Sequence, residues 1–184
     1  MILPAFDILA RSYPADENPD AVRLKIGGEI ATMPPGTNTC AMRLSRALNY
    51  AGKVHEIPEN GGILKLYTLK GGDHLNYLLR VSELTRYLYR RYGTPTVSVN
   101  YSPTETESVT PFLGKRGIIC WHVTGWDDAT GHYTLWNGQT GLYEGGEDYF
   151  STQYFPRQVQ VPPTRRNPTG IRTIRETGID LWCC

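Results

Sequence analysis

The stretch NTCAMRLSRALNYAG, residues 38–52, predicts the helix around which the rest of the chain is arranged. Its apolar residues recur every three or four positions from Ala41 to Ala51, which is the spacing of one helical face. Polar residues directly before it can cap the helix N-terminus, and Gly52 is a natural stop. Cys40 therefore lies in the first turn, either as a small apolar residue against a core or as a nucleophile.

The rest of the pattern predicts helices first and an antiparallel sheet afterwards. SELTRYLYRRYG, residues 82–93, predicts a second capped helix. KRGIICWHVTGW, residues 115–126, and HYTLWNG, residues 132–138, flank the turn DDATG and predict a β-hairpin, and YFSTQYF at 149–155 is a candidate third strand. This order indicates an α+β fold rather than an alternating one.

We expect a single domain over residues 1–184. Its length and its 40% hydrophobic residues suit one sizeable core. Residues 156–184 are rich in Pro and Arg at their start, which predicts an extended C-terminal arm whose last residues add at most a short edge strand.

The charge balance and hydropathy argue against two classes of partner. The chain has 19 basic and 18 acidic residues, so no basic excess favours nucleic acid or a membrane surface. No segment approaches the roughly 20 apolar residues of a membrane span, so we expect no membrane insertion. The first residues lack the charged and apolar regions of a Sec-type signal peptide, and we expect any export to use another route.

The four cysteines do not form a recognisable metal or disulfide framework. There is no CxxC pair and no histidine spacing typical of zinc, so the sequence predicts no metal site. Cys183 and Cys184 are adjacent at the end of the chain, which favours unpaired thiols, although their pairing stays open. Cys40 and Cys120 are separated from them and from each other.

A nucleophilic Cys40 needs a histidine from another element. His55 and His74 lie in polar, loop-like surroundings typical of exposed side chains. His132 follows a glycine at the start of the second hairpin arm, and His122 lies in the middle of the first. We favour His132 from its placement and keep His122 as the alternative.

A third group would orient the imidazole, and tryptophans would line the groove. Candidates for the third group downstream of His132 are Asn137, Glu144, Glu147 and Asp148. Two tryptophans near the hairpin, Trp126 and Trp136, can contact substrate, with core packing as the competing role.

Three segments resemble a known family. TNTCAMRLSRALNYAG, GWDDATGHYTLWNG and EDYFS are similar to the type VI secretion amidase effectors of family four, within the NlpC/P60, papain-like cysteine peptidase group. The likeness covers roughly residues 20–155, and the tail beyond it does not fit the family pattern. The resemblance implies a papain-like NlpC/P60 fold with the cysteine-bearing helix packed on an antiparallel sheet.

The resemblance also implies an activity and a set of roles. Cys40 would attack the amide between D-glutamate, through its γ-carboxyl, and meso-diaminopimelate in a peptidoglycan stem peptide. His132 would be the general base, and a downstream acid would orient it; Asp148 is our first choice and Glu144 the second. The Cys40 N–H and its helical neighbours would hold the oxyanion. No cofactor is implied.

Partners and location follow from the same resemblance. We expect a cognate immunity protein and a component of a contractile secretion apparatus as partners. The protein would be made in the cytoplasm and act in the periplasm of a target bacterium. Stem length, cross-link preference, oligomeric state and the immunity interface stay open.

Two other classes of function compete with hydrolysis. A thiol acyltransferase would use the same cysteine and histidine but pass the acyl group to an amine or alcohol. A non-catalytic wall-binding or partner-binding module would keep the papain-like fold without the chemistry.

Overall fold

The computed structural model describes residues 1–15, 18–101, 108–126, 129–139, 142–144, 157–163 and 167–184. Its α-helices are α1 (Phe6–Ser12), α2 (Pro19–Ile26), α3 (Gly28–Ala31), α4 (Cys40–Asn49) and α5 (Val81–Tyr92). Short 3₁₀ segments are η1 (Lys53–His55), η2 (Glu59–Leu64) and η3 (Thr110–Phe112). None of the helices in these ranges is both long and apolar enough to cross a bilayer.

The described strands form two antiparallel sheets. The small one pairs β1 (Thr68–Lys70) with β2 (Asn76–Leu78). The large one has the order β3-β8-β4-β5-β6, with β7 pairing β8 beyond this path. Its strands are β3 (Val97–Asn100), β4 (Arg116–Thr124), β5 (Gly131–Asn137), β6 (Leu142–Glu144), β7 (Arg157–Gln160) and β8 (Ile171–Cys183). This arrangement confirms the predicted α+β class.

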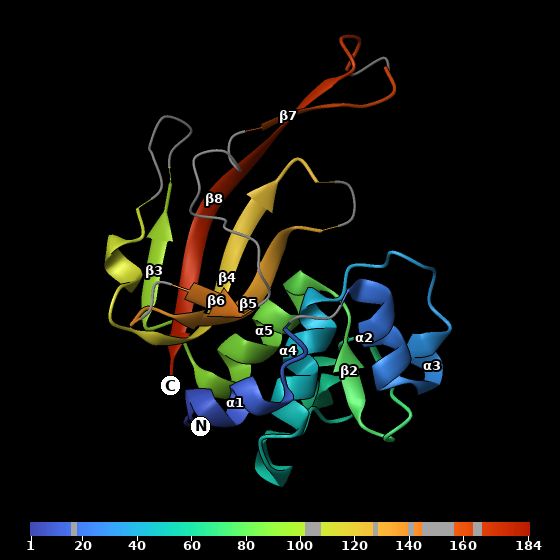
Figure 1. The fold of residues 1–184 in the computed structure, drawn as a ribbon, viewed down its shortest axis with the longest axis vertical. Helices are drawn as coiled ribbons and strands as arrows, with labels where there is room; N and C mark the ends of the chain where they lie inside the picture. Colours follow the sequence, from blue (N-terminus) through green and yellow to red (C-terminus); the bar gives the residue numbers. More distant parts are fainter. Residues whose placement is uncertain (16–17, 102–107, 127–128, 140–141, 145–156, 164–166) are drawn as a thin grey trace.

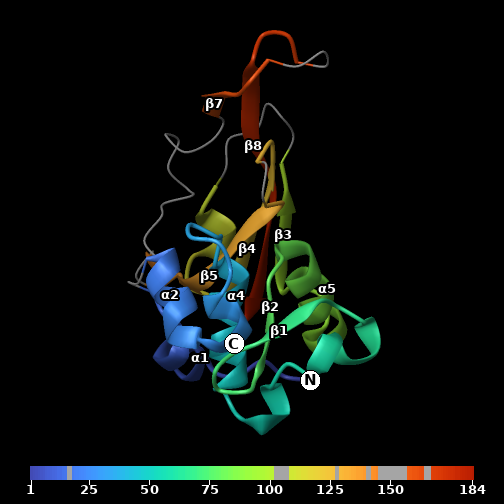
Figure 2. The same cartoon turned by 90° about the vertical axis from the view of Figure 1, so that its right-hand side faces the viewer.

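Helices α1, α4 and α5 pack against one face of the large sheet (Figure 1, Figure 2). The core between them joins α4 residues such as Leu44 to sheet residues such as Leu135. Alternate residues of the same strands, including Trp121 and Trp136, form a second apolar cluster on the opposite face. Both chain ends lie at the same end of the molecule (Figure 1).

The predicted helix after residue 38 is confirmed. Leu44, Ala47 and Leu48 are fully buried and share the face that the periodicity indicates. Burying a leucine side chain contributes roughly 1.5–3 kcal/mol, so this face fixes α4 on the sheet. The second predicted helix is α5 (Val81–Tyr92), whose N-cap is Arg80, so Ser82, the cap expected from the sequence, lies inside its first turn.

The predicted hairpin is β4–β5. Its register pairs Trp121 with His132 and His122 with Gly131. A Cβ at Gly131 would lie 2.2 Å from the Trp121 carbonyl oxygen, so only glycine admits that backbone. Gly131 thus allows β5, the strand that carries His132, to approach β4 closely.

The expectation for the C-terminal segment is wrong in its main part. Residues 171–183 form β8, which lies between β3 and β4 rather than at an edge. The Pro- and Arg-rich start of the segment 156–184 suggested an exposed arm, whereas the second half of β8 is almost completely buried. The β7–β8 hairpin projects from the sheet (Figure 1). The strand expected over 149–155 lies outside the described residues.

Candidate active site

Cys40 is the first residue of α4 and is only 4% exposed. Its N–H donates to the Asn38 side-chain oxygen at 3.0 Å, while the N-cap Thr39 makes no side-chain cap bond. To stabilise an oxyanion, this N–H must first lose its hydrogen bond to the Asn38 side chain. The next N–H groups, of Ala41 and Met42, have no acceptor within the helix because it starts here.

A cavity of about 270 Å³ opens beside Cys40. Three segments surround it: the start of α4, the residues entering α5 and the turn before β5. The lining residues are Asn38, Cys40, Leu79, Arg80, Val81, Ser82, Trp126, Ala129 and Thr130. The cavity therefore brings the helix cysteine next to the turn that leads into His132.

His132 lies two residues after this lining, at the start of β5. Its ring centroid is 6.3 Å from that of Trp121, with the planes tilted by 43°. The next residue, Tyr133, points to the helix-covered face and shares the core cluster with Cys40. The fold thus places the His132 backbone at the rim of the Cys40 pocket and its imidazole beside Trp121.

The two candidate groove tryptophans have different positions. Trp126 lies in the lining of the Cys40 pocket. Trp136 is 1% exposed, and its indole N–H donates to the Phe112 carbonyl at 2.9 Å in the cluster on the opposite face. This burial does not fit the substrate contact expected of Trp136. Its position on β5 directs the large aromatic side chain into the apolar cluster, where it packs in the core.

The candidates for the third group are only partly described. Glu147 and Asp148 lie outside the described residues. Glu144 ends β6, where its backbone pairs with Leu135. Asn137 ends β5, and its side-chain oxygen accepts from the Gln139 N–H at 3.2 Å. The orienting acid therefore stays a prediction.

A second histidine pair was not anticipated from the sequence. His122 Nε2 lies 2.8 Å from Asp180 Oδ2, and Ser98 Oγ donates to Asp180 Oδ1 at 2.6 Å. Asp180 is 4% exposed. Burial acts to raise the pKa of Asp180, but the hydrogen bonds from His122 and Ser98 outweigh it and hold the pKa below its usual value. The signal available in the sequence was the β-strand pattern of GIDLW, residues 178–182, which predicts that Asp180 is directed into the protein.

Cys120 is a fully buried thiol in the same apolar cluster as Cys40. Burial raises its pKa well above the usual thiol value, and negative charge on Asp180 or Cys40 would raise it further, while a hydrogen bond with Tyr133 acts the other way. A thiol so held is protonated near neutral pH and is a poor nucleophile.

The chemistry available in this region is thiol chemistry at a helix N-terminus. The unsatisfied N–H groups and macrodipole of α4 favour negative charge at its first turn. A cavity gives a ligand access to Cys40, and a histidine-bearing strand begins at its rim. These are the elements that nucleophilic acyl chemistry requires.

Comparison with known proteins gives a family match. The family model of the type VI secretion system amidase effector protein 4, Tae4, matches residues 37–161. No curated protein sequence matches the chain.

Solved structures extend the likeness to nearly the whole chain. Tae4 of Salmonella typhimurium, solved with the immunity protein Tai4 of Enterobacter cloacae, has a TM-score of 0.74 at 25% identity, covering 98% of this chain and 99% of that one. Tae4 of Enterobacter cloacae, solved with Tai4, has a TM-score of 0.72 at 27% identity, covering 99% of each chain. A further crystal structure of Tae4 from Enterobacter cloacae has a TM-score of 0.73 at 27% identity, covering 99% of this chain and 97% of that one. Since the family model spans more than half of its residues, this chain belongs to the type VI secretion amidase effector family Tae4.

Proposed function

We propose that this protein is a cysteine-dependent peptidoglycan amidase that cleaves the γ-D-glutamyl–meso-diaminopimelate bond of stem peptides. Membership of the amidase effector family supports the reaction class. The observation that carries the cysteine mechanism is the position of Cys40, at the start of α4 and in the lining of a cavity. The fold is proposed to be a variant of the papain-like NlpC/P60 group.

In the proposed reaction, the Cys40 thiolate adds to the amide carbonyl carbon. The first-turn N–H groups of α4 stabilise the resulting oxyanion. The His132 imidazolium then protonates the leaving amine of diaminopimelate as the C–N bond breaks, leaving a thioester on Cys40. His132 next accepts a proton from water, and the hydroxide attacks the thioester. The carboxylate product leaves, and Cys40 and His132 return to their starting states.

For this chemistry the His132 ring must reach the Cys40 thiol. Substrate binding would select the side-chain rotamer in which it does so. Apo geometries of catalytic pairs are commonly loose. Asp148, or Glu144 as second choice, is proposed to hold the other ring nitrogen.

The biological setting is proposed from the family and from the solved relatives. The two Tae4 effectors described above were solved in complex with Tai4 immunity proteins. By analogy, this protein would be an antibacterial toxin delivered by type VI secretion, acting in the periplasm of the target cell and blocked by a cognate immunity protein in the producer.

The experiment is digestion of diaminopimelate-type peptidoglycan, with mass spectrometry of the released fragments. Wild type is expected to release fragments that begin with a free diaminopimelate amine, and Cys40→Ala to release none. Cleavage at another bond would refute the proposed specificity. Equal cleavage by a folded Cys40→Ala variant would refute the cysteine mechanism.

A further inference from the structure

Arg80 is a cation in the lining of the cavity beside Cys40. Among the described residues of that lining, it is the single Lys, Arg, Asp or Glu. The residue is exposed, and within the described part of the chain its side chain makes no hydrogen bond or salt bridge. The guanidinium is therefore available to an anion that enters the cavity.

Arg80 also occupies a position that helix energetics do not favour for a cation. It is the N-cap of α5, where Ser, Thr, Asp or Asn normally accepts from a first-turn N–H, and here no side chain caps the helix. Its charge lies at the positive end of the helix dipole. The acid of the first turn, Glu83, is engaged elsewhere, because its Oε1 accepts from the Tyr67 N–H. A residue that breaks local rules without compensation within the fold is a candidate for ligand recognition.

A bound carboxylate would compensate for both unfavourable features. The first N–H groups of α5 have no acceptor within the helix, and Val81 and Ser82 of this first turn line the cavity. A carboxylate beside Arg80 can accept from these N–H groups and from the guanidinium. Leu79 and Val81, on either side of Arg80, add apolar side chains to the same lining. The lining therefore suits a carboxylate carried on a short aliphatic chain.

The proposed substrate carries such a group close to the bond that is cleaved. A glutamate linked through its γ-carboxyl keeps its α-carboxylate free, and a short aliphatic chain separates this carboxylate from the carbonyl that Cys40 would attack. Cys40 and Arg80 line the same cavity. A stem peptide that presents its carbonyl to the thiol can thus present its carboxylate to the guanidinium.

We propose that Arg80 determines substrate specificity by binding the free α-carboxylate of the γ-linked D-glutamate, which orients the scissile carbonyl toward Cys40. The choice of substrate rests on the proposed function, whereas the unpaired cation in the Cys40 cavity is a feature of the fold itself. Arg80 binds substrate and takes no part in bond making or proton transfer. A stem peptide in which a carboxamide replaces this carboxylate is therefore expected to be a poor substrate.

The test compares two synthetic stem peptides that share the scissile amide. One is N-acetyl-L-alanyl-γ-D-glutamyl-meso-diaminopimelate, and the other has D-isoglutamine in place of D-glutamate, so that only the α-carboxylate is lost. Wild type is expected to cleave the carboxylate peptide with a kcat/KM roughly tenfold or more above that for the carboxamide peptide. Arg80→Gln should abolish this preference by slowing cleavage of the carboxylate peptide alone, and Arg80→Lys, which keeps the charge, should retain part of it. Equal kcat/KM for both peptides in wild type, or equal losses on both in Arg80→Gln, would overturn the proposal.

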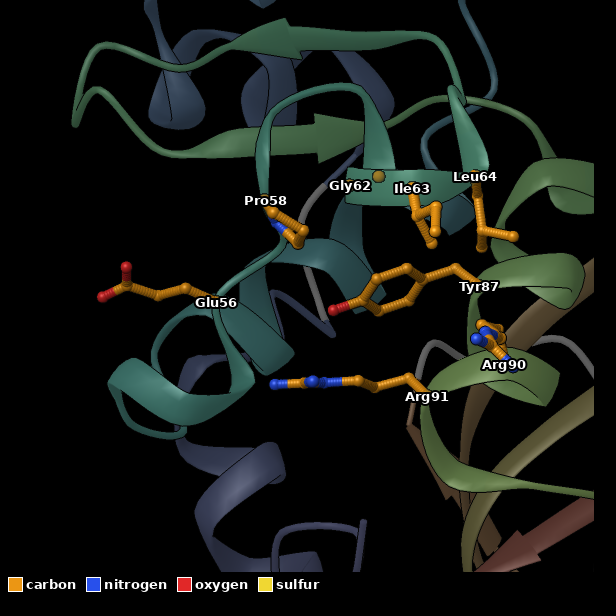
Figure 3. A pocket seen from close by; sticks show the side chains of 9 residues that line it. Glu56, Pro58, Gly62, Ile63, Leu64, Tyr87, Arg90 and Arg91 are labelled. Atoms are coloured by element: carbon orange, nitrogen blue, oxygen red, sulfur yellow. The ribbon is translucent and has the colours of Figure 1, made fainter.

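Arg90→Gln is the matched control for the loss of one positive charge. Arg90 is an exposed arginine near the C-terminal end of α5, and it lines a different cavity, between α5 and η2 (Figure 3). This variant should keep the wild-type rate and the wild-type preference for the carboxylate peptide. A loss of preference equal to that of Arg80→Gln would show an effect of net charge and would overturn the assignment to Arg80.

Binding by Cys40→Ala separates a failure of this inference from a failure of the proposed hydrolysis. In calorimetric titrations, Cys40→Ala should bind the carboxylate peptide roughly tenfold more tightly than the carboxamide peptide, and Cys40→Ala/Arg80→Gln should bind both alike. If wild type cleaves neither peptide while this difference in affinity is present, the proposed hydrolysis fails and the carboxylate contact stands. If Cys40→Ala binds neither peptide, or binds both alike, the carboxylate contact is refuted whatever the hydrolysis result.

Discussion

Cys40 and Cys120 pack in one apolar cluster, yet their surroundings favour opposite chemistry. Cys40 begins a helix and lines a cavity, whereas Cys120 is enclosed in the middle of β4, where burial raises its pKa. The comparison teaches that burial alone does not decide the role of a cysteine. A helix N-terminus and an open path to solvent separate the candidate nucleophile from the structural thiol.

The largest expected effect tests the difference between the two cysteines directly. Cys40→Ala should lower peptidoglycan hydrolysis by about 10³-fold or more, because the nucleophile is lost. Cys120→Ala should leave hydrolysis within a few-fold of wild type and cost about 1 kcal/mol of unfolding free energy through a small cavity. Both are measured by fragment release and by urea denaturation. Similar activity losses in the two variants would mean that the cysteines share a structural role.

The two strand histidines extend the comparison. His132→Ala should reduce hydrolysis by roughly 10²–10⁴-fold, as for a general acid–base group. His122→Ala removes a hydrogen bond to Asp180 and should mainly lower stability. Steady-state rates of both variants, measured beside their melting curves, separate the roles. A greater loss of activity for His122→Ala, with its fold intact, would show that His122 rather than His132 is the general base.

The Asp180 cluster should show in the pH dependence of stability. The pKa of Asp180 is lowered in the folded state, so its stabilisation is present above the ordinary carboxyl pKa of 3.8 and is lost as pH falls through the lower folded value. Asp180→Asn should therefore cost roughly 1–3 kcal/mol at pH 7 and less at pH 3. Urea denaturation at several pH values measures this. A difference from wild type that stays constant with pH would contradict the ionised, hydrogen-bonded carboxylate.

The smallest expected effect concerns the Asn38 side chain, which lies one residue before the N-cap of α4 and accepts from its first N–H. Asn38→Ala removes the acceptor for the Cys40 N–H and should cost about 1 kcal/mol of unfolding free energy. Asn38→Asp keeps an acceptor and is the matched variant, expected to retain that stability. Thermal unfolding of both variants tests the contribution of this hydrogen bond. Equal melting temperatures for Asn38→Ala and wild type would show that the bond contributes nothing.

Periodicity and turn chemistry predicted the elements that carry Cys40 and His132. The helical face of α4 and the β4–β5 hairpin follow from local sequence, and so does the glycine before His132. The central position of β8 was not predictable, because its pairing with β3 and β4 joins residues 51 to 84 positions apart, a separation that no local pattern encodes. The Asp180–His122 bond and the burial of Trp136 depend on that same pairing.

The most direct test of the central claim is the pH dependence of Cys40 alkylation by iodoacetamide, resolved by peptide mass spectrometry from the other three cysteines. A nucleophile paired with His132 at a helix N-terminus should react with an inflection well below the ordinary thiol pKa of about 8.5. His132→Ala should move that inflection upward toward the ordinary value. An inflection near or above the ordinary value in wild type, unchanged in His132→Ala, would contradict the account and leave Cys40 as a core residue.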